Sequence, residues 1–307
     1  MNTISQIANK KACGGDISAN TGKLGCLSLF GTPDHLLAIR RGSKIPSTTV
    51  FDLAYITPMI QTGAIIPLMG ASAFEDQSAE DSYSTNSSGV KRLNLKGLPE
   101  YKFMYEEGHE FYRQLDKLEG YKNFDYIIGD DEGNWMLATN SDGSYSGFSA
   151  GHTTPELTKR KVPGGDAESK SVLIQFLERS QFDRNYAILH QKELTFTPMD
   201  IQGVNGVEIK YNAIPTEGGD LDVQVVLAQD RNTPVEGLTQ FAVVANGVSG
   251  AATASAGASP GQYTLSPSTP TVADDIIVVK LGTSVQSVSD SNGALFRAIP
   301  NEATVSS

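Results

Sequence analysis

Hydrophobic and polar residues alternate along several short stretches of the chain, which is the period of a half-buried β-strand. Residues 124–139, FDYIIGDDEGNWMLAT, place two apolar segments around a polar turn and predict a hairpin. A short apolar strand between two turns is expected within residues 30–46. A further strand, within residues 98–108, is predicted to bury one face, made by Leu98, Tyr101, Phe103 and Tyr105. This pattern predicts a mainly β fold.

One segment has the period of a helix instead. Phe111, Leu115 and Leu118 recur at positions i, i+4 and i+7, and a glycine stands at each end of the segment. We therefore predict one helix over residues 108–119. Its single apolar stripe is expected to pack against the sheet of the same domain.

Two stretches lack either period and are predicted to be irregular. Residues 1–50 are rich in glycine and could form an extended N-terminal arm. Residues 149–171 combine proline, glycine and mixed charges, which predicts a long loop. The segment PTEGGD, at residues 215–220, is typical of a linker. We accordingly predict two domains, an N-terminal tube-type β domain over 1–218 and a C-terminal domain over 219–307.

The C-terminal domain is predicted to be a small β-sandwich. It contains about five short strands separated by turns and no helical segment, which is typical of the immunoglobulin-like fold. Residues 242–268 contain no charged residue, histidine or cysteine, and are expected to be scaffold. The expected fold class is therefore an N-terminal β-sandwich or barrel-like domain with one packed α-helix and long loops, followed by an immunoglobulin-like β-sandwich.

The composition is that of a globular protein, with 39% hydrophobic and 19% charged residues in a chain of 307. A net charge of −11 argues against a protein built to grip nucleic acid, because phosphate binding requires clustered Lys and Arg. No apolar run approaches the roughly 18 to 20 residues of a membrane span. The N-terminus lacks the apolar segment of a secretory signal, so we expect a soluble protein made in a cytoplasm. The basic run TKRK, at residues 158–161, either docks onto an acidic neighbour or is a solvated loop.

No set of residues predicts a catalytic, cofactor-binding or metal site. Metal-ligand spacing is absent among the four histidines, which are His35, His109, His152 and His190. The only two cysteines, Cys13 and Cys26, are expected to be reduced and buried, and a disulfide between them is the alternative. We therefore expect a protein that is not an enzyme and that needs no cofactor.

Other residues that could suggest chemistry are better explained as parts of the scaffold. The acidic run at 130–132 lacks the spacing of a calcium loop and is predicted to lie in a hairpin turn. Ser249 lies between glycines but lacks the GxSxG spacing of a nucleophile elbow. The acidic pairs at 106–107 and 274–275 are expected at solvated ends of regular elements. Trp135 is predicted to lie in the core.

The order of these parts resembles that of the major tail-tube proteins of long-tailed bacteriophages, several of which carry a C-terminal immunoglobulin-like domain. Residues 100–135 match the first domain of that family in their order of strand, helix, strand and turn. A pattern in the second domain is similar to the immunoglobulin-like repeats of phage virion proteins, and it consists of Val235, Gly237, Leu238, Phe241, Asn246, Gly247, Gly261, Tyr263, Thr264, Leu265 and an apolar strand at 276–279.

The resemblance implies a non-enzymatic virion protein that forms the phage tail tube. In that family six subunits close their β-sheets into a ring, and rings stack around a channel for DNA. The expected partners are copies of the chain itself and other tail or connector proteins, with no specific nucleic-acid binding and no membrane. The expected location is the virion tail, assembled in the host cytoplasm. The alternatives are a head–tail connector ring, a capsid decoration or fibre-base protein, and a carbohydrate-binding or adhesion module.

Overall fold

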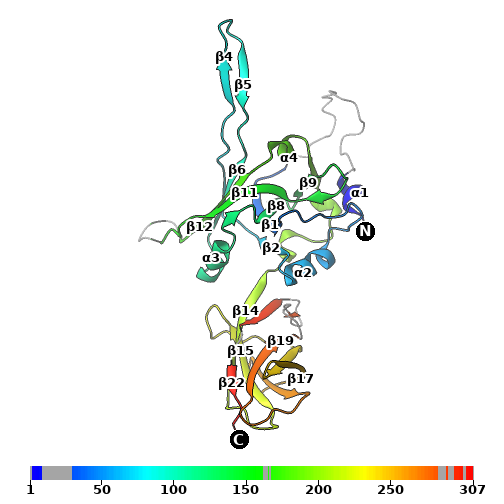
Figure 1. Cartoon of the computed structure of the whole chain (residues 1–307), viewed down its shortest axis with the longest axis vertical. Coiled ribbons are helices and arrows are strands. Elements are labelled where there is room, and N and C mark those ends of the chain that lie inside the picture. Colours follow the sequence, from blue (N-terminus) through cyan, green and yellow to red (C-terminus); the bar gives the residue numbers. More distant parts are fainter. Residues whose placement is uncertain are drawn as a thin grey trace. The chain divides into compact units, whose positions relative to one another are not determined.

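The chain is mainly β and forms two compact units (Figure 1). One unit comprises Met1–Ile56 and Ala64–Ile201, and the other comprises Thr57–Gly63 and Gln202–Ser307. The computed structural model describes residues 2–8, 30–161, 165, 167–282, 288–289, 294–299 and 302–306. The predicted β-rich fold class is confirmed. None of the helices in these ranges is long and apolar enough to cross a membrane.

The first unit is built on an eleven-stranded sheet. Seven of its strands lie in the order β10-β9-β8-β11-β12-β6-β3. The other four pair beside this path: β1 with β8 and β2, β13 with β9, and β7 with β11. The strands are β1 Pro33–Arg40, β2 Ile65–Leu68, β3 Ala73–Asp76, β6 Glu100–Tyr105, β7 Gly120–Tyr121, β8 Phe124–Asp130, β9 Trp135–Thr139, β10 Tyr145–Ser146, β11 Phe148–Pro155, β12 Lys170–Phe176 and β13 Tyr186–Leu189.

This sheet rolls up around its own core. Strand β11 pairs with β8 through its first residues and with β12 through the rest. On the other side, the segment between β2 and β3 joins β1 to β6, because Ala71 N donates to Asp34 O and Ser72 N donates to Met104 O. These contacts bend the sheet into a half-barrel, and its interior-facing side chains fill it as expected for a small β-barrel.

The predicted helix is confirmed as α3, His109–Asp116, and it packs on this sheet. Leu115 is fully buried, and Tyr112 and Leu118 lie beside it in the same core. Its other neighbours there are aromatic and aliphatic side chains from the strands, among them Phe103, Tyr105, Tyr126, Phe148, Val172, Ile174 and Phe176. The strand predicted before this helix and the hairpin predicted after it are also present, as β6 and as β8 with β9.

The first unit contains more helix than the single one predicted. The additional helices are α1 Ile4–Ala8, α2 Leu53–Gln61, whose second half clusters with the other unit, and α4 Arg179–Asp183. Helices α1 and α4 have five residues each, too few to show a 3.6-residue period. Helix α2 contains Pro58, which normally marks the end of a helix.

The loop predicted at 149–171 is shorter in the structure, because strands occupy both of its ends. Strand β11 ends at Pro155, β12 begins at Lys170, and Lys159 bridges to Ser169 between them. Strand β11 shows no alternation of apolar residues because it buries the polar side chain of Thr153. The Thr153 hydroxyl lies 2.8 Å from the Tyr126 hydroxyl, and this hydrogen bond removes the cost of burying both groups.

The N-terminal region is not an extended arm in its described parts. Helix α1 buries Ile4 and Ile7, and β1 has five consecutive buried residues between two neighbouring strands. Residues 9–29, which include Cys13 and Cys26, lie outside the described residues.

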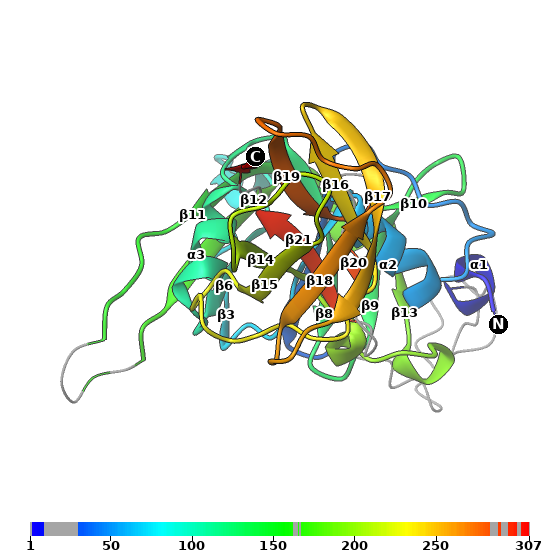
Figure 2. The same ribbon diagram turned by 90° about the horizontal axis from the view of Figure 1, so that it is seen from below.

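The second unit is a continuous nine-stranded sheet folded over one core, which gives it a sandwich-like form (Figure 2). The strand order is β20-β21-β14-β15-β18-β17-β16-β19-β22. The strands are β14 Val204–Tyr211, β15 Leu221–Leu227, β16 Phe241–Ala245, β17 Val248–Ala256, β18 Gln262–Pro267, β19 Ile276–Leu281, β20 Val288–Ser289, β21 Leu295–Ile299 and β22 Glu302–Thr304.

This unit begins earlier in the chain than the sequence indicated. Residues 204–211 lie within the predicted first domain, whereas β14 pairs with β15 and, in parallel, with β21 of the second unit. Val207 and Ile209 are buried in the second core. The glycine-rich segment at 215–220 therefore connects two strands of one unit.

Residues of the pattern between Val235 and Leu265 meet inside the second core. The Tyr263 hydroxyl donates to Val235 O at 2.8 Å and accepts from Leu238 N at 3.2 Å. The rings of Tyr263 and Phe241 lie 5.0 Å apart between centroids. The pattern thus specifies packing between β16, β18 and the segment that precedes β16.

Candidate functional site

A two-stranded hairpin projects from the first unit and pairs with no other strand of the described chain (Figure 1). It consists of β4 Ser82–Thr85 and β5 Lys91–Leu95, and every residue of both strands is exposed. We call residues 79–98 the arm. An isolated two-stranded hairpin is at best marginally stable in water, so contacts at its base or with another molecule are needed to keep it folded.

The arm has two chemically different faces. Tyr83 lies directly opposite Leu93 on one face, and the pairing shifts by one residue beyond them, so that Leu95 lies opposite Ser82. On the other face Ser84 pairs with Arg92, and the Ser84 hydroxyl donates to Asn94 Oδ1 at 2.8 Å. We call the first the apolar face and the second the polar face.

The apolar face is uncovered within the described chain. Its side chains are 56% exposed at Tyr83 and 44% at Leu93. Exposed large apolar side chains are unremarkable when scattered, but a contiguous patch usually marks an interaction surface. The apolar face is therefore the best candidate for a functional surface in the first unit.

The tip of the arm is a tight turn with a positive charge beside it. Asn86 Oδ1 accepts from Ser88 N at 3.0 Å and from Val90 N at 2.9 Å. Gly89 supplies the left-handed backbone conformation that the turn needs. Residues 82–95 contain two basic side chains, Lys91 and Arg92, and no acidic one. The projecting end of an acidic protein is thus basic.

The base of the arm is held to helix α4. The Arg179 guanidinium bonds Asp81 and lies 3.5 Å from a carboxylate oxygen of Asp183. Gly97 N donates to Asp81 Oδ1 at 2.9 Å, and this bond, together with Arg179, holds the pKa of Asp81 below its usual range. A side chain at Gly97 would overlap the carbonyl oxygen of Ala79, so glycine permits the two segments to approach. These contacts fix the direction in which the arm leaves the unit.

Replacing Arg179 by methionine is expected to loosen the arm without unfolding the unit. The change removes the bonds to Asp81 and Asp183, which are exposed enough to contribute little to global stability. Amide hydrogen exchange in peptides covering 82–95 should become several-fold faster, while the melting temperature changes little. Arg184→Met, on the same segment, is the control. Unchanged exchange in the Arg179 variant would show that these contacts do not hold the arm.

The histidines considered in the sequence analysis do not come together. His35 is buried and accepts a hydrogen bond from Gly70 N at its Nδ1 atom, 2.9 Å away. His109 lies 3.3 Å from Glu168, and His152 lies 2.7 Å from the Thr154 hydroxyl. Among the described residues, no group of three or more His, Cys, Asp and Glu side chains is arranged to hold a metal ion.

The acidic run at 130–132 lies in the turn between β8 and β9, as predicted. The buried Asp130 carboxylate accepts hydrogen bonds from the backbone N–H groups of Gly31, Glu132 and Asn134. It therefore ties the turn to the segment before β1. Trp135 is fully buried, which confirms its predicted place in the core.

The remaining sequence candidates lie apart from one another. Glu106 and Glu107 are exposed between β6 and α3, and Ser249 is exposed on β17. Asp275 accepts a hydrogen bond from Val272 N. In the basic run, Arg160 pairs with Glu168 of its own hairpin at 2.8 Å.

A carboxyl group near this turn has a strongly shifted pKa. Burial, and then the negative charges of Asp131 and Asp130, raise the pKa of Asp34 from 3.8 to about 6. Its Oδ1 atom is buried and accepts no hydrogen bond from the described residues. The ionised form is therefore disfavoured in the folded protein.

Asp34→Asn is expected to change how stability depends on pH. The pKa of Asp34 is higher in the folded state, so its contribution is most favourable below about pH 4 and is lost as the pH rises through 6. Burial lowers the pKa of the adjacent His35. The shift at His35 makes stability increase with pH, whereas the shift at Asp34 makes it decrease. The parent should therefore lose stability relative to the variant between pH 4 and pH 7. Urea unfolding across this range measures the difference, and parallel profiles would contradict it.

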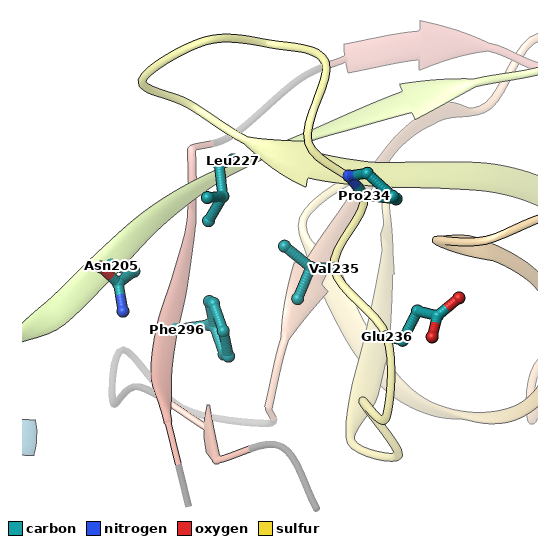
Figure 3. A pocket seen from close by; sticks show the side chains of 6 residues that line it. All are labelled: Asn205, Leu227, Pro234, Val235, Glu236 and Phe296. Carbon is teal, nitrogen blue, oxygen red and sulfur yellow. The ribbon is translucent and has the colours of Figure 1, made fainter. Parts of the chain in front are cut away.

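Two hollows in the described part of the second unit are lined mainly by apolar and small residues. One, of about 240 Å³, is lined mainly by Leu227, Pro234, Val235 and Phe296, with Asn205 and Glu236 also lining it (Figure 3). Ligand sites typically enclose about 300 to 1,000 Å³. The other, of about 450 Å³, is lined chiefly by small residues of 256–261. The arm remains the better candidate for function.

Comparison with known proteins adds no family. No protein-family model matches the chain, and no curated protein matches its sequence.

Proposed function

We propose that the chain is a non-enzymatic structural subunit of a phage tail tube, which assembles with copies of itself into stacked rings around a channel for DNA. The observation that carries this proposal is the arm, whose apolar face is covered by no described residue of its own chain. Burial of apolar surface is the main driving force of protein association. A projecting surface of this kind is useful to a protein that must bind another chain.

The first unit also has features that suit ring formation. Strand β3 pairs with β6 and presents its other edge without a partner among the described residues. Exposed strand edges pair readily with other chains, and assembly into a closed ring satisfies them. Both the edge and the arm would then become contacts between subunits.

The charge of the chain supports a channel through which DNA passes. With a net charge of −11, a surface of this protein facing the channel would repel phosphate more than bind it. Such a tube would not hold DNA during passage. We further propose that the protein is located in the virion tail, where other tail or connector proteins are its remaining partners.

Negative-stain electron microscopy of the purified full chain tests the proposal. We expect rings with a central pore that stack into tubes as the protein concentration rises. Rings that never stack would favour a head–tail connector instead. A protein that remains monomeric at all concentrations would contradict the proposed function.

A further inference from the structure

We propose that His35 is a pH-sensitive latch, which holds the segment between β2 and β3 while its imidazole is neutral and releases that segment when the ring binds a proton. We call residues 69–72 the connecting segment. The latch operates within a single copy of the chain, so it does not depend on the proposed function.

The backbone of the connecting segment is attached to β1 and β6 by hydrogen bonds. Gly70 N donates to His35 Nδ1 at 2.9 Å. Ala71 N donates to the backbone carbonyl of Asp34 at 2.8 Å, and Ser72 N donates to a carbonyl of β6 at 2.7 Å. Of these three acceptors, the imidazole nitrogen is the one whose protonation changes near neutral pH. One of the bonds that join β1 to β6 through this segment is therefore sensitive to pH.

A protonated imidazole cannot accept the hydrogen bond from Gly70. In the neutral ring one nitrogen carries a proton and the other is an acceptor. Because Nδ1 of His35 accepts from Gly70 N, the proton of the neutral ring is on Nε2. A second proton binds at Nδ1, where it faces the N–H group of Gly70. Protonation therefore replaces the hydrogen bond with a repulsive contact between two donors.

The surroundings of His35 favour the neutral ring while the segment is attached. The side chain is buried and lies near the indole of Trp135, with 6.4 Å between the ring centroids. Burial lowers the pKa of His35 from 6.5 by more than the carboxylates of Asp130 and Asp131 raise it. Once the segment is released and water reaches the ring, the pKa returns toward about 6.5.

The titratable groups that face His35 are carboxyl groups. Asp34, on the same strand, has its Oδ1 atom 3.3 Å from His35 Nε2, and Asp130 and Asp131 lie in the β8–β9 turn. Burial and the other two carboxylates raise the pKa of Asp34 to about 6, so it loses its charge in the range where the ring gains one. Tyr105, on β6, stays neutral because burial raises its pKa. Asp34 therefore offers a protonated ring less compensating charge as the pH falls.

Acid consequently favours release of the connecting segment. The pKa of His35 is lower with the segment attached than with it released, so protons bind more tightly to the released form. The released population is smallest above about pH 6.5. It rises by up to about tenfold for each pH unit below that value, until the attached form also binds the proton. Release loosens the closure of the half-barrel between β1 and β6.

Hydrogen exchange of the full-length protein at about pH 7.5 and about pH 5 tests the proposal, with rates corrected for the intrinsic pH dependence of amide exchange. Peptides covering 69–72 should lose protection by about fivefold or more at the lower pH. Peptides covering β12 are the internal control and should change by about twofold or less. Equal loss in both regions would indicate global unfolding. That result, or no loss at 69–72, would overturn the proposal.

His35→Asn identifies the group responsible. The amide oxygen of asparagine can replace Nδ1 as the acceptor for Gly70 N, and it binds no proton in this pH range. Protection of 69–72 in this variant should therefore change by about twofold or less between the two pH values. His152→Asn is the matched control, because His152 is exposed and its Nδ1 atom contacts the Thr154 hydroxyl. It should behave like the parent. An acid-induced loss in His35→Asn as large as that in the parent would refute the latch.

Asp34→Asn separates the two neighbouring groups that titrate. Asp34 contributes its backbone carbonyl to the connecting segment, and that carbonyl remains in the variant. The variant should therefore keep the acid-induced loss of protection at 69–72. Protection that no longer depends on pH in this variant would assign the effect to Asp34 and overturn the role of His35.

A histidine titration covers the case in which His35→Asn does not fold. Carbon-13 labels at the Cε1 atoms of the parent report the protonation of its four histidines by NMR. Substitution of the other three assigns their signals and leaves that of His35. Its midpoint should lie below about 6.5 and coincide with the loss of protection at 69–72. A midpoint that differs from that loss by more than about one pH unit would contradict the proposal.

Discussion

Replacing Leu115 by alanine is expected to lower the free energy of unfolding by about 2 to 5 kcal/mol. Leu115 is fully buried between α3 and the rolled sheet, so its removal leaves a cavity that rigid neighbours cannot fill. Domains are stabilised by only about 5 to 15 kcal/mol in total. The variant should therefore melt at a markedly lower temperature, or fail to fold, in a circular dichroism experiment.

Lys117→Ala is the matched control for this substitution. Lys117 is exposed, and its ammonium group contacts the Gln114 side chain at 2.8 Å. Its replacement should leave the melting temperature nearly unchanged. A Leu115→Ala protein that melts like the parent but elutes as a monomer in size-exclusion chromatography would instead place the apolar stripe of α3 at a subunit interface.

The second large effect concerns the boundary of the C-terminal unit. A fragment of residues 202–307 is expected to unfold cooperatively, whereas residues 219–307 should not fold. The shorter fragment lacks β14, which hydrogen-bonds to β15 on one side and to β21 on the other. It also loses the buried side chains of Val207 and Ile209, each of which contributes about 1.5 to 3 kcal/mol on burial.

Urea denaturation of the two fragments, followed by circular dichroism, measures this difference. The longer fragment should give one sigmoidal transition, and the shorter one a gradual change without a folded baseline. Equal and cooperative transitions would show that the unit is complete without β14, and would support the boundary near residue 218 that the linker-like sequence indicated.

The sequence predicted those elements whose own residues carry a clear hydrophobic period. Helix α3 has three apolar residues on one stripe, and the β8–β9 hairpin has apolar segments on both sides of its turn. Strand β11 has no such period because Thr153 is buried through its bond to Tyr126. Strand β14 has the right pattern, but its partners lie at residues 221–227 and 295–299, and local sequence does not specify them.

The arm shows why the candidate site was harder to predict than the fold. Residues 74–90 are polar and acidic overall, which indicates a solvated edge. Tyr83 is separated from Leu93 by a turn, and only the pairing register places the two side chains on one face. The polar residues around them conceal an apolar surface that needs both strands to form.

The central claim is that the apolar face of the arm contacts another copy of the chain. Site-specific photo-cross-linking tests it most directly, with a photoreactive residue at position 93 or, as the control, at position 94. Each labelled protein is mixed under assembling conditions with a second copy that carries a tag of different mass. We expect cross-links between the two copies from position 93 and several-fold fewer from position 94. Equal yields from both positions, or none from position 93 while the protein assembles, would contradict the claim.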